Sequence, residues 1–150
     1  MNCSDLSNEE KRQVYAILKT KLRIALDQEF YLEALLLEYA IAEDRLNSIL
    51  DHLNVNRKNK KGKDIGITFK IDRVRRLISE SNLAHKRITI EQLDTIMEWK
   101  MIRDDLVHHS CQHLFNNDEV RDCALTGAEV VRLLSNSAQK IKRAVEKQTN

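Results

Sequence analysis

The chain has 150 residues, of which 42% are apolar, 32% charged and 5% aromatic, with no proline and three glycines. This composition disfavours a sheet protein, which needs more turn-forming, β-branched and aromatic residues. The net charge of +2 conceals segregation: residues 57–87 carry eleven basic against three acidic side chains, whereas residues 27–51 carry one against seven and residues 88–129 three against nine. The basic middle suits a polyanion such as RNA, or alternatively faces the acidic segments.

Two long helices are predicted in the first third of the chain. The first should begin at Asn8 and end near Asp27, because Ser7-Asn8-Glu9-Glu10 has the S-x-x-E pattern of a capping box. Its apolar stripe would be Val14, Leu18, Leu22 and Ala25. In the second helix, apolar residues recur with helical spacing for about six turns. They are Leu32, Leu35, Leu36, Tyr39, Leu46, Ile49, Leu50 and Leu53.

A basic segment follows the second helix. Residues 54–66, NVNRKNKKGKDIG, are expected to form an exposed loop, and residues 68–83 a shorter helix that ends in a break at 84–88. The polar side of this helix would be basic, with Lys70, Arg73, Arg75 and Arg76. The candidate RNA-binding residues of the whole segment are Lys58, Lys60, Lys61, Arg73 and Arg76.

Two further long helices are predicted in the last 60 residues. Thr89-Ile90-Glu91-Gln92 is a second capping box, and the helix after it should stop near His109 or Ser110. Its expected buried face is Ile90, Leu93, Ile96, Met97, Met101, Ile102 and Leu106. The last helix should begin near Asn117 and carry a heptad seam of Val120, Ala124, Gly127, Val131, Leu134, Ala138, Ile141 and Val145. This seam is either an ordinary core stripe or an intermolecular coiled coil.

Together these elements predict an all-α fold, an antiparallel bundle of four long helices plus a short one. It would form a single domain over 1–150 with an exposed basic loop at about 54–66. The opening MNCSDLSNEEKR lacks the apolar core of a signal peptide, and no run approaches the roughly 20 apolar residues of a membrane span. Because the three cysteines are odd in number and irregularly spaced, we expect a cytoplasmic protein without disulfides or membrane contact.

The stretch MIRDDLVHHS, residues 101–110, places Arg103 and Asp104 shortly before His108 and His109 at the end of a long helix. Arginine grips phosphate with a planar fork, and histidine exchanges protons near neutrality, so the two suffice for RNA cleavage without a metal or other cofactor. The bare spacing is common, because Arg45 and His52 also have it, but there the apolar Leu46 follows the arginine.

The context of Arg103 resembles the R-[polar]-x-x-x-H motif of HEPN domains (higher eukaryotes and prokaryotes nucleotide-binding), helical bundles of about this length with the motif late in the chain. Many members are metal-independent ribonucleases that act as homodimers, and others are non-catalytic RNA-binding or interaction modules. The resemblance implies that Arg103 holds the scissile phosphate, that His108 is the acid–base residue with His109 as an additional candidate, and that Asp104 orients one of them. Toxin members paired with a nucleotidyltransferase antitoxin often have tyrosine two residues after the histidine, where this chain has Ser110.

Helical geometry adds a condition to this site. Five residues along a helix place His108 about 140° around the axis from Arg103, so the two side chains diverge. They converge if the helix loosens after Val107, or if a symmetry mate supplies the second histidine. A catalytic site would then consist of residues from two chains.

Three functions are therefore open. The first is a dimeric HEPN-type endoribonuclease, a toxin or phage-defence component with a cognate antitoxin protein. The second is a non-catalytic HEPN-like module that binds RNA, a nucleotide or a protein partner. The third is a plain helical assembly protein that dimerises through Val131 and Leu134 of the seam.

Other side chains also form candidate sites. His108, His109, Cys111 and His113 crowd together, but their spacing matches no common zinc finger, so no metal is expected. Cys111 between two histidines could be a nucleophile, although no oxyanion-hole feature accompanies it. Glu38 and Glu43 on the second helix either line a cleft or form surface salt bridges.

Overall fold

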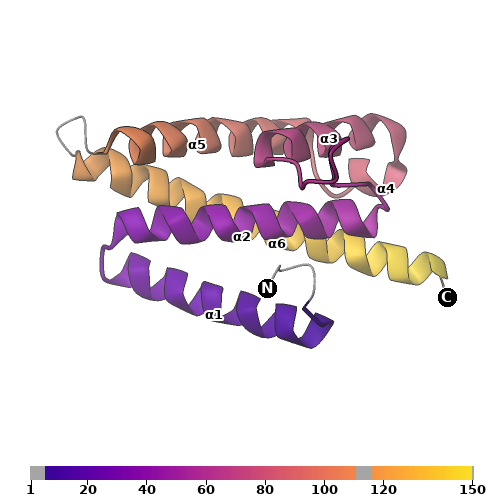
Figure 1. The fold of residues 1–150 in the computed structure, drawn as a ribbon, viewed down its shortest axis with the longest axis horizontal. Coiled ribbons are helices and arrows are strands. Elements are labelled where there is room, and N and C mark those ends of the chain that lie inside the picture. The colour runs from indigo at the N-terminus through magenta and orange to yellow at the C-terminus, as the bar shows by residue number, and fades with distance from the viewer. Residues whose placement is uncertain (1–5, 111–115, 150) are drawn as a thin grey trace.

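The computed structural model describes residues 6–110 and 116–149, and helices account for most of them (Figure 1). They are α1 (Asn8–Asp27), α2 (Tyr31–His52), α3 (Ile67–Glu80), α4 (Asn82–His85), α5 (Ile90–His109) and α6 (Asn117–Thr149). No strand occurs in the described ranges. The four long helices α1, α2, α5 and α6 form the predicted bundle, and α3 and α4 pack beside α2, α5 and α6. The all-α fold is confirmed.

Both predicted capping boxes are present and fix the start of a helix. In α1 the Ser7 hydroxyl accepts the Glu10 backbone N–H (3.2 Å), and the Glu10 carboxylate accepts the Ser7 N–H (2.7 Å). In α5 the pair Thr89 and Gln92 makes the same two bonds, at 3.2 and 3.0 Å. Each box satisfies backbone donors that a helix start leaves without a partner.

The centre of the core is the contact between α2 and α6, which run in the same direction (Figure 1). The seam predicted on the last helix faces this contact: Val120, Ala124, Gly127, Val131, Leu134, Ala138 and Ile141 are all buried. It is therefore a core stripe of one chain, and the alternative in which Val131 and Leu134 join two chains is wrong, because both are covered by their own chain.

The short helices differ from the prediction in their limits. The helix expected over 68–83 ends at Glu80, because Ser81 is extended (φ −130°, ψ 119°), and α4 adds one turn at 82–85 before the chain leaves helical conformation. Serine and asparagine side chains compete for backbone hydrogen bonds, which favours interruption at Ser81-Asn82. The break therefore begins three residues earlier than expected.

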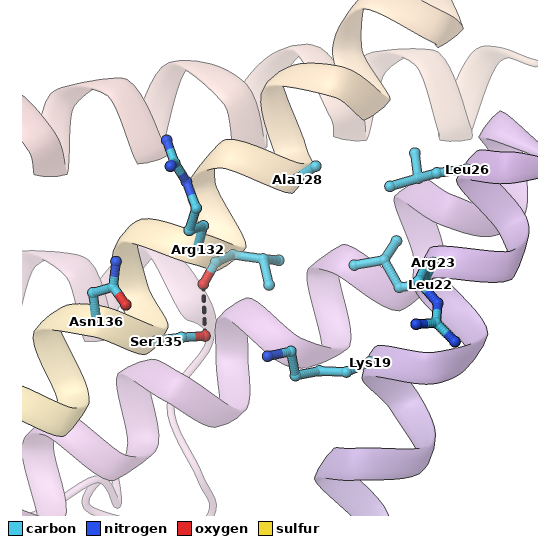
Figure 2. Close-up of a pocket in the computed structure, with 9 residues that line it drawn as sticks. Lys19, Leu22, Arg23, Leu26, Ala128, Arg132, Ser135 and Asn136 are labelled. Atoms are coloured by element: carbon cyan, nitrogen blue, oxygen red, sulfur yellow. Dashed lines mark hydrogen bonds between the residues drawn. The ribbon is translucent and has the colours of Figure 1, made fainter.

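The outermost long helix is α1, which packs mainly on α2. The Tyr15 hydroxyl and the Ser135 hydroxyl are 2.6 Å apart and tie α1 to α6. A pocket of about 320 Å³ lies between these two helices (Figure 2). Its cationic side chains are Lys19, Arg23 and Arg132, over apolar Leu22 and Leu26, and Arg132 also pairs with Glu129.

The buried face predicted for α5 is confirmed only in part. Leu93 and Ile96 are buried as predicted, and Met97 and Leu106 are half-buried. Ile90, Met101 and Ile102 are exposed instead, whereas Trp99 and Arg103 are buried. Apolar residues lie on both sides of this helix, so its sequence does not select the face that packs; contact with α6 and α3 does. The consequence for the motif is that Arg103 belongs to the core side of α5.

Candidate functional site

Arg103 is nearly buried, with 9% of its surface exposed, and two side chains, Tyr39 and Asp104, contact its guanidinium. Its guanidinium lies over the ring of Tyr39 on α2, 4.3 Å from the centroid, a cation–π arrangement. Its Nη1 donates to Asp104 Oδ1 at 2.9 Å. Its Nε is enclosed without an acceptor among the described residues.

Asp104 pairs with two cationic side chains of α5, Arg103 and Lys100. Lys100 Nζ, one turn earlier on α5, lies 2.8 Å from the other carboxylate oxygen. Partial burial acts to raise the pKa of Asp104, but the hydrogen bonds and charges of Lys100 and Arg103 outweigh it and bring the pKa below its usual value. The aspartate therefore stays ionised at neutral pH and accepts a hydrogen bond from Arg103 Nη1.

The two histidines lie at the end of α5, away from the core. His108 is exposed. His109 Nδ1 lies 3.0 Å from the backbone oxygen of Asp105 and 2.9 Å from its carboxylate, one turn earlier. Because α5 remains helical through His109, it does not loosen after Val107, and no hydrogen bond or ion pair joins His108 to Arg103. One chain thus brings Arg103 and Asp104 together but not Arg103 and His108.

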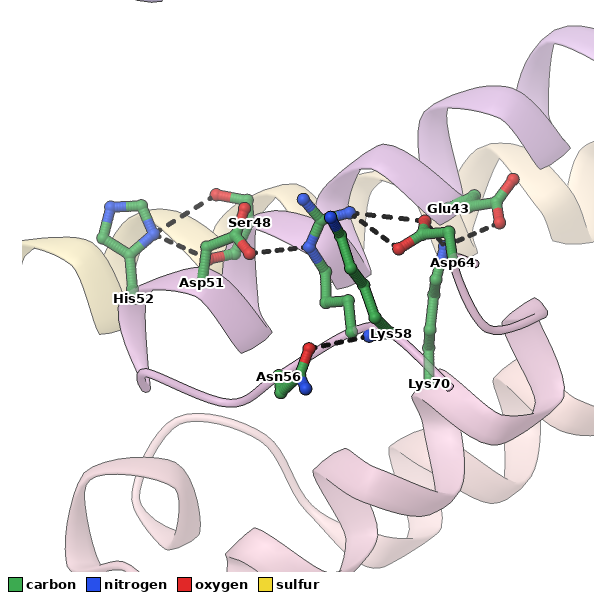
Figure 3. A network of polar contacts seen from close by, with 9 residues as sticks. Glu43, Ser48, Asp51, His52, Asn56, Lys58, Asp64 and Lys70 are labelled. Atoms are coloured by element: carbon green, nitrogen blue, oxygen red, sulfur yellow. Dashed lines mark hydrogen bonds and ion pairs between the residues drawn. The ribbon is translucent and has the colours of Figure 1, made fainter. Parts of the chain in front are cut away.

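The basic loop is ordered by its own polar groups. Arg57 bridges Asp51 (2.6 Å) and Asp64 (3.3 Å), and the Asn59 side chain accepts backbone N–H groups of Lys61 and Lys63 (Figure 3 shows the Asp51 and Asp64 contacts). The predicted RNA-binding residues Lys58, Lys60, Lys61 and Arg76 are exposed, and Arg73 is half-buried. The loop therefore presents its lysines to solvent from a fixed backbone.

Lys70 corrects the predicted basic face of the helix at 68–83. It is buried, and its ammonium lies between Glu43 Oε1 (2.8 Å) and Asp64 Oδ2 (3.0 Å) (Figure 3). Arg75 pairs with Asp94 of α5 at 2.7 Å. Basic α3 and the acidic helices thus neutralise each other in part. The alternative in which the basic segment faces the acidic segments therefore holds for Lys70 and Arg75. Glu43 forms the salt bridge expected of it.

Glu38 departs from both expectations, because it neither lines a cleft nor forms a surface salt bridge. It is fully buried, and neither carboxylate oxygen has a hydrogen-bond partner among the described residues. It lies against Gly127 of α6, where a Cβ would stand 1.9 Å from Glu38 Oε2 and 2.7 Å from Trp99 Nε1. Burial raises the pKa of Glu38 to about 9, so the group is a neutral acid at pH 7.

The buried polar cluster consists of Glu38, Trp99, Arg103 and Cys123, from three helices. Trp99 Nε1 and Arg103 Nε, like both Glu38 oxygens, have no partner in the described part of the chain. Burial, together with the nearby Glu38, raises the pKa of the Cys123 thiol to about 11, which leaves it protonated and unreactive. The spacing along α2 could have indicated that Glu38 is buried, because it lies three residues after the buried Leu35 and four after the buried Ala34, on the same side of the helix.

The candidate zinc site of His108, His109, Cys111 and His113 falls partly outside the described residues. Cys111 and His113 lie outside the described residues, and within residues 6–110 and 116–149 no three His, Cys, Asp or Glu side chains are grouped to hold a metal.

A groove of about 590 Å³ between α5 and α6 opens beside the motif. It is lined by Met101, Ile102 and Leu106 and by four carboxylates, Glu98, Asp105, Glu119 and Asp122. No described helix has the length and apolarity needed to cross a bilayer.

Comparisons with protein-family models, curated proteins and solved structures find no match to this chain. The resemblance of the motif around Arg103 to HEPN domains therefore stays a prediction from the sequence.

Proposed function

We propose that the chain is a metal-independent endoribonuclease of the HEPN type that acts as a homodimer on RNA. The observation that carries the proposal is the end of α5, where an exposed imidazole, His108, follows an arginine whose orientation is set by Asp104 and Tyr39. A preoriented guanidinium stabilises charge that develops on phosphate, and an exposed imidazole reaches a substrate proton.

The proposed reaction needs no group beyond these side chains. The ribose 2′-oxygen attacks phosphorus and loses its proton to one histidine, while the 5′-oxygen leaves and takes a proton from another. The products are a 2′,3′-cyclic phosphate and a 5′-hydroxyl. Because His108 and Arg103 diverge on one continuous helix, the two copies of a homodimer would form one shared cleft, in which the His108 of one copy takes the proton and the protonated His108 of the other gives one. Exposed Lys58, Lys60 and Lys61 would guide RNA toward it.

The test is cleavage of single-stranded RNA in EDTA. His108→Ala should lower the rate at least about 100-fold, the contribution of general acid–base catalysis. Arg103→Lys, which keeps the charge but loses the fork, should lower it about 100-fold as well. Thermal unfolding checks that both variants remain folded.

Matched controls exist in the same chain. Arg45 pairs with the neighbouring Asp44 and lies 4.0 Å over the ring of Tyr15, so Arg45→Lys removes the same kind of contacts away from the motif. His85→Ala removes another exposed histidine. Both controls should cleave like the wild type. Cleavage that survives in His108→Ala and Arg103→Lys would overturn the proposal.

A second candidate function has its own supporting observation. Arg103 is 9% exposed and already engaged by Asp104, which suits a structural arginine in a non-catalytic module that binds RNA, a nucleotide or a protein such as an antitoxin. RNA binding without cleavage, lost when Lys58, Lys60 and Lys61 are replaced by glutamine, would identify it. Membership of a toxin or phage-defence system is part of the first proposal and would be tested by growth arrest on expression that His108→Ala relieves.

A further inference from the structure

The outer face of α1 is a second apolar surface that the fold does not use. Leu22 and Ala25 lie on the side of α1 that faces the core. Val14, Ile17 and Ile24 lie on another side and are exposed, with 55% of the Ile17 surface accessible. These three residues recur at helical spacing and extend over about 15 Å of helix. Residues 11–23 carry five Lys or Arg and no acid, so this apolar stripe lies on a basic helix.

The groove between α5 and α6 has the opposite character. Met101 and Ile102 are exposed by 63% and 56% and stand beside a floor that reaches the buried Trp99. Its lining contains four carboxylates and no Lys, Arg or His. Asp105 lies beside His109, and Asp122 pairs with Arg121, whereas Glu98 and Glu119 have no ion-pair partner among the described residues. The groove follows α5 from Thr95 to Leu106, about 16 Å.

We infer that the outer face of α1 docks into the α5–α6 groove of a second copy of this chain. The stripe and the groove have similar lengths, and a basic amphipathic helix complements an apolar groove with an acidic rim. The inference goes beyond the proposed ribonuclease function, because it concerns a different contact from the twofold arrangement of Arg103 and His108.

Charge excludes the two symmetric alternatives. A twofold contact between α1 faces would bring Lys21, which lies within the stripe between Ile17 and Ile24, toward its own copy. A twofold contact between grooves would oppose two sets of four carboxylates. Only the head-to-tail pairing matches opposite charges. Since α1 and α5 lie on opposite sides of the bundle (Figure 1), one chain can use both surfaces at once, which gives closed rings or open chains of copies.

The test is sedimentation velocity of the full chain from about 5 to about 200 µM, at low and high salt. The wild type should associate with increasing concentration, and less at high salt. Ile17→Glu on the α1 face and Ile102→Glu at the groove should each raise the dissociation constant at least about tenfold. Phe69→Glu, which charges another exposed side chain, on α3, should leave association unchanged.

Mixing the two disabled variants isolates the head-to-tail geometry. An equal mixture of Ile17→Glu and Ile102→Glu retains one intact α1 face and one intact groove, so this contact should join one copy of each variant and should not extend into rings or open chains. A wild type that stays monomeric would overturn the inference, because another molecule would then have to cover these faces. A mixture of the two variants that stays monomeric would overturn it as well. His108→Ala should associate like the wild type, which separates this contact from the proposed catalysis.

Discussion

Replacing Glu38 by glutamine is expected to remove a pH dependence of stability that this one side chain imposes. The folded protein buries the carboxyl group among Gly127, Trp99, Arg103 and Cys123 and raises its pKa from 4.5 to about 9. The folded state therefore keeps a proton that the unfolded chain releases above pH 4.5. The stabilising effect of this proton is complete below pH 4.5 and is lost as the pH rises through 9.

The magnitude follows from the two pKa values. One proton difference changes the free energy of unfolding by about 1.4 kcal/mol per pH unit, hence by about 4 kcal/mol between pH 5 and pH 8. Glutamine has nearly the shape of the neutral acid but does not titrate. The difference in stability between Glu38→Gln and the wild type should therefore shift by about 4 kcal/mol in favour of the variant over this interval.

The assay is urea unfolding at pH 5, 6, 7 and 8, followed by far-ultraviolet circular dichroism and by the fluorescence of Trp99. Trp99 is the only tryptophan of the chain and lies in the same cluster, so its emission in the native state should also titrate near pH 9. Glu33→Gln, an exposed change on the same helix, should keep the wild-type slope. Equal slopes for the wild type and Glu38→Gln would refute the burial of an ionisable Glu38.

Two further predictions concern buried contacts. Gly127→Ala should lower the free energy of unfolding by about 1 to 3 kcal/mol despite the better helix propensity of alanine, because the new Cβ would stand 1.9 Å from Glu38 Oε2; calorimetry should show recovery when Glu38→Ala is added. Lys70→Met should cost less than about 1 kcal/mol, whereas Glu43→Gln with Asp64→Asn, which leaves the buried ammonium of Lys70 without an anionic partner, should cost about 3 kcal/mol in urea unfolding. Equal losses of stability in Lys70→Met and in the Glu43→Gln, Asp64→Asn variant would contradict the expectation that removing the buried charge costs less than removing its partners.

The helix starts and the seam could be predicted because their causes are local. A capping box depends on four consecutive residues, and the structure confirms both, at Ser7 and Thr89. The seam around Gly127 repeats over many turns, so its periodicity alone indicates a packed face. At Gly127 the absence of a side chain leaves room for the carboxyl group of Glu38, a neighbour that could not be foreseen from the last helix alone.

The burial of charged residues could not be predicted with the same rules. Because Glu38, Lys70 and Arg103 are charged, they are expected at the surface. Their positions relative to the buried apolar residues of the same helices predict burial instead. The structure resolves each conflict by a long-range partner or by a change of protonation. Lys70 is paired with Glu43 across 27 residues of sequence, and Glu38 is neutral. Neither solution is visible in a window of one helix.

The two halves of the proposed motif therefore carry different information about function. Arg103 belongs to a junction of three helices, since Tyr39 covers its guanidinium, Asp104 holds Nη1, and Cys123 of α6 lies within its electrostatic reach. A change at Arg103 alters packing and chemistry together. His108 is exposed beyond the core, so a change there leaves the junction intact. Loss of RNA cleavage in His108→Ala at unchanged stability would be evidence for catalysis that no substitution of Arg103 can supply.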